Sequence, residues 1–243
     1  MRMSAPAEIM PGEIMVALQL ASAASPVGSY AYSDALEQAV ADRLISDEPS
    51  ARSWIQGVLR NGLCGLDLPL LARMHHALSN DEFTTAVQLS EFLLACRETA
   101  ELRASDRDQG RALLRVVDAL APERSKALRA RLADSGSISY ALGYAHYATC
   151  HGICVDLTAT AYAYAWVENQ VQCAMKLVPF GQTQAQLMIR ELVSDHALNA
   201  SIEASSDSII DVLDGLDGIA SGMPGHAIAS ARHETLYSRL YRS

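Results

Sequence analysis

Apolar residues recur at three- and four-residue spacing along most of this chain, which places them on one face of an α-helix. No sustained stretch alternates apolar and polar residues as a half-buried strand would, and no Asn-Gly or Asp-Gly pair joins two β-rich segments. The pattern predicts helices at 13–24, 31–43, 49–63, 68–78, 83–102, 105–120, 123–133, 138–151 and 155–178, from Thr183 onward, and around 209–216. The predicted fold class is therefore all-α.

Capping and packing signals refine this pattern. Ser79 and Glu82 have the spacing of a capping box ahead of the next helix, and Ser105 gives a similar start signal. The helices at 138–151 and 155–178 are rich in alanine, glycine and tyrosine. Because small side chains let helix backbones approach closely, we expect this pair at the centre of the bundle.

Composition narrows the class of protein. The chain has 243 residues, of which 50% are hydrophobic and 19% charged, as in a globular domain with a sizeable core. The formal net charge of −9 argues against nucleic acid as a ligand, because phosphate binding requires a basic face. The five cysteines are widely spaced, which favours reduced thiols and a cytoplasmic protein. No signal peptide and no uninterrupted apolar run of membrane-spanning length is present.

Catalytic signatures are absent from the sequence. It contains no GxxxxGK[ST], HExxH or GxSxG motif, so a P-loop, a zincin site and a nucleophile elbow are excluded. The Pro-Val-Gly-Ser sequence at 26–29 is interpreted as a turn between helices. We therefore expect a protein that binds other proteins and is not an enzyme.

One group of residues suggests a metal site. His146, Cys150, His151 and Cys154 offer ligands suited to zinc, copper or nickel, and the first two are four residues apart on one predicted helix. The spacing matches no zinc-finger pattern, and buried cysteine is common in helical cores. Structural packing is therefore the favoured interpretation, with metal binding as the alternative and no tightly bound cofactor expected.

Three polar segments remain as candidates for partner binding. The charge run at 97–103 is interpreted either as a solvated helix face, with Arg97 and Glu101 paired, or as a contact surface. The polar residues at 168–170 and Lys176 interrupt an apolar helix, so they require partners or an interface, with acid–base work by Glu168 and Lys176 as the alternative. The terminal segment 232–242 combines tyrosine, leucine and arginine, which are typical of interfaces, and Leu236 and Leu240 have helical spacing.

Four segments of the chain resemble the urease accessory protein F (UreF) family. They follow one another along nearly the whole chain: LQLASAASPVGSYAYSDALEQAV at 18–40, RETAELRASDRDQGRALL at 97–114, YAWVENQVQCAMKLVPFGQTQAQ at 164–186 and RHETLYSRLYRS at 232–243. Small departures from the family pattern occur at Ser29, Phe180 and Tyr241, and they conserve size and polarity broadly.

The resemblance implies a fold and a function. The fold is a single-domain bundle of about ten helices, with a flexible arm at 1–12, the helical domain at 13–225 and a tail at 226–243 that becomes ordered on partner binding. The implied function is that of a co-chaperone for urease maturation, which works as a homodimer. It bridges the D/H-type accessory protein and the G-type GTPase, modulates GTP-dependent metal delivery, and so assists nickel insertion into the urease apoenzyme. Nickel is handled by the complex.

The resemblance and the polar segments together give two sets of site residues. The predicted partner-binding residues are Glu37, Arg97, Glu98, Arg103, Lys176, Arg232, His233, Glu234, Tyr237, Arg239, Leu240, Tyr241 and Arg242. The predicted turn and structural residues are Pro26, Gly28, Tyr30, Glu168, Asn169, Pro179, Gly181 and Gln182.

Overall fold

The computed structural model describes residues 9–25, 28–135, 137–207, 216 and 219–242, and within these ranges it contains helices and no strand. This confirms the all-α class. In chain order the elements are α1 (Pro11–Ala21), a 3₁₀ turn η1 (Ser29–Ala31), α2 (Leu36–Ala41), α3 (Glu48–Val58), a π-helix η2 (Leu59–Asp67), α4 (Leu68–Ser79), α5 (Phe83–Cys96), α6 (Ala100–Leu120), α7 (Pro122–Ser135), α8 (Tyr140–Cys150), α9 (Val155–Leu177), α10 (Gln182–Val193), α11 (His196–Asp207) and α12 (Pro224–His233).

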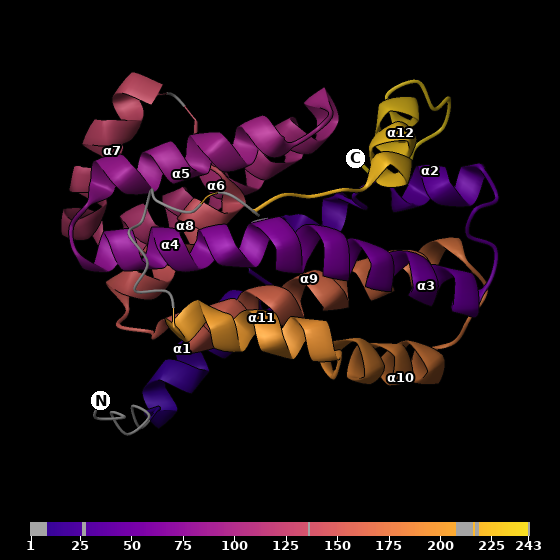
Figure 1. The fold of residues 1–243 in the computed structure, drawn as a ribbon, viewed down its shortest axis with the longest axis horizontal. Helices are drawn as coiled ribbons and strands as arrows, with labels where there is room; N and C mark the ends of the chain where they lie inside the picture. Colours follow the sequence, from indigo (N-terminus) through magenta and orange to yellow (C-terminus); the bar gives the residue numbers. More distant parts are fainter. Residues whose placement is uncertain (1–8, 26–27, 136, 208–215, 217–218, 243) are drawn as a thin grey trace.

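A continuous helical rod crosses the middle of the molecule (Figure 1). It begins at the N-cap residue Asp47, whose carboxylate accepts from the Ser50 N–H at 3.0 Å, and runs through α3, η2 and α4. The predicted break between residues 63 and 68 is wrong, because the backbone widens there into a π-helix. Such widening often marks a functional region. Gly62 and Gly65 lie in this segment, where an added Cβ would meet Met223 and the Ala220 carbonyl within 3 Å.

The boundary between α5 and α6 differs from the prediction. The helix expected to run to residue 102 ends at Cys96, and α6 starts at Ala100. Thr99 caps α6 by accepting from the Leu102 N–H at 3.1 Å, so this threonine is the start signal in place of Ser105. The capping box expected at Ser79 is also absent, since that hydroxyl donates to the His75 carbonyl inside α4.

Other boundaries are corrected on a smaller scale. The helix predicted at 31–43 is reduced to η1 and the short α2. Pro179 follows the end of α9, as expected for a residue that cannot continue a helix. The next helix starts at Gln182 with Gly181 as its N-cap, where the glycine N–H donates to Gln184 Oε1 at 2.9 Å. Thr183 is therefore not the cap.

The ends of the chain lie partly outside the described residues. Most of the predicted arm at 1–12 is not described, and its last two residues form the first turn of α1. The helix predicted around 209–216 lies outside the description except for Leu216, whereas α11 was not predicted. After α12 the chain is not helical, so the predicted i,i+4 pair of Leu236 and Leu240 does not form.

The core is densest around α8, where every residue from 141 to 148 is buried. This helix packs mainly against α6 and α4, whereas α9 packs against α1 and α10. Gly110 of α6 allows the close approach, because a Cβ there would lie 2.6 Å from the carbonyl oxygens of Ile138 and Ser139. The placement of α8 at the centre is confirmed. Among the described residues, no helix combines the length and apolarity needed to span a membrane.

Candidate functional site

Polar side chains of α9 hold the turn before α2 in a strained conformation. Asp34 and Ala35 have φ values of 49° and 66°, in the left-handed region that side chains rarely adopt. Asn169 Nδ2 donates to the Tyr32 carbonyl at 3.1 Å, and Gln170 Nε2 donates to the Asp34 carboxylate at 3.4 Å. The polar interruption of α9 therefore fixes the backbone that leads into α2.

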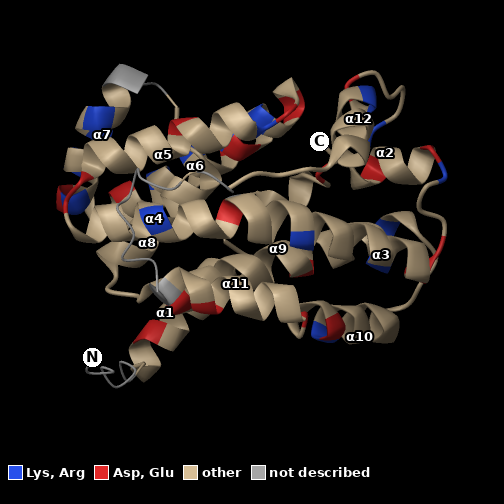
Figure 2. Ribbon diagram, in the orientation of Figure 1, with Lys and Arg blue, Asp and Glu red and all other residues tan. Residues whose placement is uncertain are grey.

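Glu37, in the first turn of α2, anchors the segment that follows α12, residues 234–242, which is called the tail from here on. Its carboxylate accepts the backbone N–H groups of Leu240 at 2.7 Å and Tyr241 at 2.9 Å. The Arg242 N–H donates to the Ala31 carbonyl at 2.8 Å. Figure 2 shows α2 and α12 side by side, with acidic positions on α2 and basic positions on or beside α12. The tail is thus recognised through its main chain.

His233, the last residue of α12, lies between two carboxylates and is completely buried. Its Nε2 atom is 3.2 Å from Glu37 Oε2, and its Nδ1 atom is 3.0 Å from Glu101 Oε2. Arg239 Nη1 pairs with Glu101 Oε1 at 3.1 Å and also donates through Nη2 to the Glu234 carbonyl. These contacts tie α2, α6, α12 and the tail into one network.

The tail buries one aromatic ring and exposes another. Tyr241 is 5% exposed, and the Lys176 ammonium lies 5.9 Å from its ring centre. Burial raises the pKa of Tyr241, and the neighbouring Cys173 thiol adds to the shift. Tyr237 is fully exposed and Leu240 is 63% exposed. The backbone of the tail is therefore fixed while two large side chains remain available.

A second ionic cluster joins the end of η2, the residue after α5, and α6. Arg97 donates to Asp67 Oδ2 at 3.0 Å and to Asp106 Oδ2 at 2.7 Å, and Tyr162 also donates to Asp67 at 3.3 Å. Burial lowers the pKa of Arg97, but the two carboxylates outweigh it and raise the pKa well above its ordinary value. The predicted pairing of Arg97 with Glu101 is wrong, because Arg97 lies beyond the end of α5 and turns inward.

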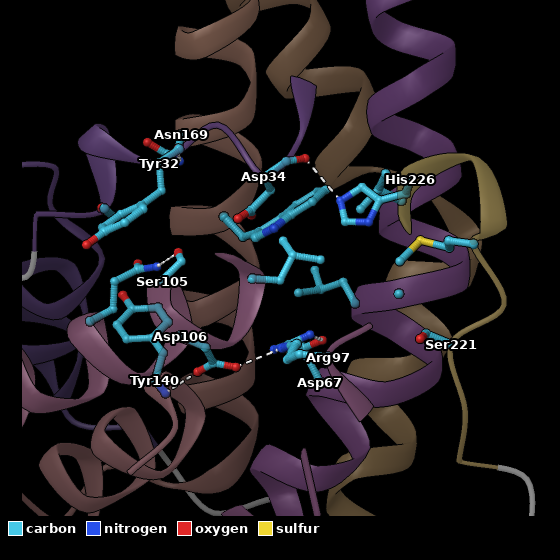
Figure 3. A pocket seen from close by; sticks show the side chains of 18 of the residues that line it. Tyr32, Asp34, Asp67, Arg97, Ser105, Asp106, Tyr140, Asn169, Ser221 and His226 are labelled. Atoms are coloured by element: carbon cyan, nitrogen blue, oxygen red, sulfur yellow. Dashed lines mark hydrogen bonds and ion pairs between the residues drawn. The ribbon is translucent and has the colours of Figure 1, made fainter. Parts of the chain in front are cut away.

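This cluster forms one wall of a cavity of about 100 Å³ (Figure 3). Asp34 and His226 face it from the opposite side, where His226 Nε2 donates to the Asp34 carbonyl at 3.0 Å. Burial raises the pKa of the Asp34 carboxyl and lowers that of His226. Both groups are therefore biased towards their neutral forms.

Other predicted partner-binding residues are dispersed. Arg232 of α12 pairs at 2.8 Å with Asp42, the C-cap residue of α2. Glu98 is exposed and accepts from the Ser221 hydroxyl at 3.2 Å. Arg103 donates to the backbone carbonyl that follows α5. The charge run at 97–103 is thus divided between a buried junction and an exposed surface.

Three of the predicted turn and structural residues line a different cavity. Tyr30, Glu168 and Asn169, together with the predicted partner-binding residue Lys176, surround a space of about 250 Å³ between α1, η1 and α9. Gly28 has φ of 73°, which favours glycine at the start of η1. Burial raises the pKa of Glu168. Pro26 lies outside the described residues.

The four metal candidates do not form a site. The Cys150 sulfur lies 3.8 Å from His146 Nδ1, but His151 stacks on Tyr147 and its Nδ1 lies 2.8 Å from that residue's carbonyl oxygen. Cys154 is the N-cap of α9. Within the described part of the chain, no three His, Cys, Asp or Glu side chains are grouped so that they could hold a metal ion. The pair at residues 146 and 150 is part of the packed core.

Several residues of the site were not predicted from the sequence. Glu101 was considered only as a helix-surface partner of Arg97, and Asp34, Asp67 and Asp106 were not singled out. The one available signal was polarity inside apolar segments, as at Asp67, which lies between Leu66 and Leu68. Their long-range pairing depends on helix packing, which local spacing does not encode.

The fold and site together define a class of protein. An all-helical body presents an anchored tail with exposed tyrosine and leucine, which is typical of a protein that binds other proteins. The UreF family model matches residues 45–193. The chain is 39% identical over 226 residues to the urease accessory protein UreF of Alkalilimnicola ehrlichii, 36% over 229 residues to that of Marinomonas sp., and 37% over 231 residues to that of Klebsiella pneumoniae subsp. pneumoniae. These alignments cover 93% of this chain and 93%, 92% and 96% of the relatives.

The chain therefore belongs to the UreF family of urease accessory proteins. It is an accessory protein of urease maturation and not itself an enzyme.

Proposed function

We propose that this chain bridges a D/H-type accessory protein and a G-type GTPase, and that it modulates GTP-dependent delivery of nickel to the urease apoenzyme. In this proposal nickel is the cargo of the complex, and the chain itself binds no cofactor tightly. It acts as a homodimer, as the resemblance to its family implies. The D/H-type protein binds the C-terminal tail.

One observation supports the tail as the binding site for the D/H-type protein. Its backbone is fixed by Glu37, while Tyr237 and Leu240 project fully or largely into solvent. Tyrosine is among the residues that contribute most to binding at interfaces, and a rigid backbone lowers the entropy lost on association. Ile228 of α12, the helix that leads into the tail, is also exposed, at 61%.

The contact with the GTPase is proposed for three residues that lie outside the network of Glu37, His233 and Glu101. Glu98 and Arg103 lie near the start of α6, and Lys176 is exposed at the end of α9 beside Tyr241. Replacing Lys176 with alanine removes a cation–π contact of about 0.5–1 kcal/mol, which is too little to unfold the chain. We expect Lys176→Ala to impair urease activation more than solubility, whereas aggregation of the variant would indicate a structural lysine.

The test of tail binding compares two exposed leucines. Leu240 is 63% exposed on the tail, and Leu187 is 59% exposed on α10. We expect Leu240→Ala combined with Tyr237→Ala to weaken binding to a purified D/H-type protein at least tenfold by calorimetry, and Leu187→Ala to leave it unchanged. Because all three side chains are exposed, folding should be preserved in each variant. Equal affinities in all variants would refute the assignment.

A sizing-column experiment tests the bridging role. The full chain, mixed with D/H-type and G-type proteins, should elute as one complex containing all three. A chain truncated before Arg232 should keep its helical circular dichroism and lose the D/H-type protein. Unchanged co-elution would contradict the proposed tail contact, and failure to capture either protein would contradict bridging.

A further inference from the structure

The basic residues of α6 form a single row along the helix. Arg103, Arg107, Arg111 and Arg115 follow one another at four-residue spacing, which places neighbouring side chains one turn apart on the same side of the helix. The row is about 18 Å long, because each helical residue rises about 1.5 Å. Arg103 and Arg107 are half-buried, whereas Arg111 and Arg115 are exposed. The row therefore emerges from the protein towards the C-terminal half of α6.

The carboxylates of α6 do little to neutralise this row. Three of the four form ion pairs with side chains outside the helix, namely Glu101, Asp106 and Asp118. The fourth, Asp108, lies 3.7 Å from Arg111, and both side chains are 53% exposed, so this pair is weak. Among the described residues, Arg107 and Arg115 form no ion pair, and the buried Nε atom of Arg107 has no hydrogen-bond partner. The positive charge of the row is thus left largely uncompensated.

Folding alone gives no reason for such a row. Like charges four residues apart on a helix repel each other, so the row destabilises the element that carries it. The chain as a whole has a formal net charge of −9, so the row is a local positive surface on an acidic protein. A nucleic acid would extend past the row and meet this acidic remainder. A short row of carboxylates on another protein fits better, because arginine and carboxylate pair through two parallel hydrogen bonds.

A bridging protein needs two surfaces that can be occupied at the same time. The surface of the tail is apolar and aromatic, since it is formed by Tyr237 and Leu240. The row on α6 is basic, and it begins at Arg103, one of the residues assigned above to the GTPase contact. The two surfaces therefore differ in chemistry, as expected for two different partners.

We propose that Arg107, Arg111 and Arg115 continue the GTPase contact from Arg103 along α6, where they bind a row of carboxylates on the G-type GTPase. This inference rests on the proposed bridging function and names the surface that the GTPase occupies. Complementary charge steers association and fixes the orientation of the partner. Binding through this row therefore depends on the ionic strength.

The affinity of the full chain for a purified G-type GTPase tests the row, measured by surface plasmon resonance at about 50 mM and about 500 mM salt. Arg111→Gln combined with Arg115→Gln should raise Kd about three- to twentyfold at low salt, because each exposed ion pair contributes up to about fivefold. The difference should shrink at high salt. Arg43→Gln combined with Arg190→Gln is the matched control, which removes the same charge at exposed positions outside α6 and should leave Kd unchanged.

Two further double variants separate charge from shape. Arg111→Lys combined with Arg115→Lys keeps the charge and should recover most of the affinity. Arg111→Glu combined with Arg115→Glu reverses the charge and should weaken binding beyond the glutamine variant. All these positions are exposed, so folding should be preserved, and helical circular dichroism checks this. Affinities that do not follow the order of charge would overturn the proposed contact.

The results distinguish failure of this inference from failure of bridging. If the wild-type chain binds the GTPase and the glutamine variant of α6 binds it equally well, the row is not the contact and bridging still stands. If the wild-type chain does not bind the GTPase, the bridging function fails and this inference fails with it. Binding of a single-stranded oligonucleotide that the glutamine variant loses, at unchanged affinity for the GTPase, would also overturn the inference.

Discussion

Replacing Arg97 with methionine would strand two buried carboxylates. The Arg97 side chain is 20% exposed, and its partners Asp67 and Asp106 are 8% and 5% exposed. Removing one member of a buried ion pair costs about 3–5 kcal/mol, chiefly because the remaining charge stays buried without compensation. For a chain of this size each kcal/mol lowers Tm by about 2–4 °C, so we expect a decrease of about 6–20 °C.

The matched control is Arg129→Met, which breaks the pair with Asp118. Those side chains are 51% and 29% exposed, and a pair at the surface contributes about 0–1 kcal/mol, or at most about 4 °C. Both variants are compared by thermal unfolding followed by circular dichroism. The Asp67→Asn and Asp106→Asn changes, added to Arg97→Met, should recover part of the loss because no charge is then stranded. Equal decreases for Arg97→Met and Arg129→Met would refute this account of the cluster.

Three further predictions test other parts of the structure. Glu37→Ala removes two charge-assisted bonds to backbone N–H groups, together about 3 kcal/mol, and should increase tryptic cleavage in the tail about a hundredfold at unchanged Tm; Glu234→Ala is the control, and an uncleaved tail would contradict the assigned anchor. Gly110→Ala places a Cβ 2.6 Å from two carbonyl oxygens and should cost about 1–3 kcal/mol in urea unfolding, whereas Gly57→Ala meets nothing within 4 Å and should not destabilise; equal midpoints would argue against the tight α6–α8 contact. Burial lowers the pKa of His146 to about 4, so the unfolded chain takes up a proton first as the pH falls from about 6.5, and up to about 3 kcal/mol of stability is lost by pH 4. His146→Leu should lose less stability between pH 7 and pH 4.5, and identical losses would exclude this cause.

The sequence predicted the elements well where the signal was local. Pro179 and the apolar spacing of α9 fixed the end of that helix, and the alanine-rich composition of α8 indicated its burial. The predicted helix boundaries are wrong where a long-range contact outweighs the local capping signal. Thr99 is a better cap than Ser105 in this structure because a break after Cys96 lets Arg97 reach two aspartates. One of these aspartates, Asp67, lies 30 positions away in the sequence, so the gain cannot be seen in a local window.

The candidate site was also predictable only where residue composition or the family resemblance marked it, and not where it depends on long-range contacts. The tail was named from its tyrosine, leucine and arginine content, Glu37 from the family resemblance, and the polar interruption of α9 was expected to need partners. That Asn169 and Gln170 find those partners in the strained turn at Asp34 could not be predicted, because neither hydrophobic period nor capping residues encode a contact across 136 positions. Glu101 was missed because helical spacing alone favours its nearest charged neighbour.

Anchoring the tail by its main chain separates two evolutionary constraints. Glu37 contacts the N–H groups of residues 240 and 241, which every amino acid except proline provides. The outward side chain at position 240 is therefore free to mutate without loss of attachment, while Glu37 and the path of the tail are retained; under the proposed function, this is where partner preference would change. For the same reason, libraries randomised at positions 237 and 240 offer a direct route to variants with altered partner choice.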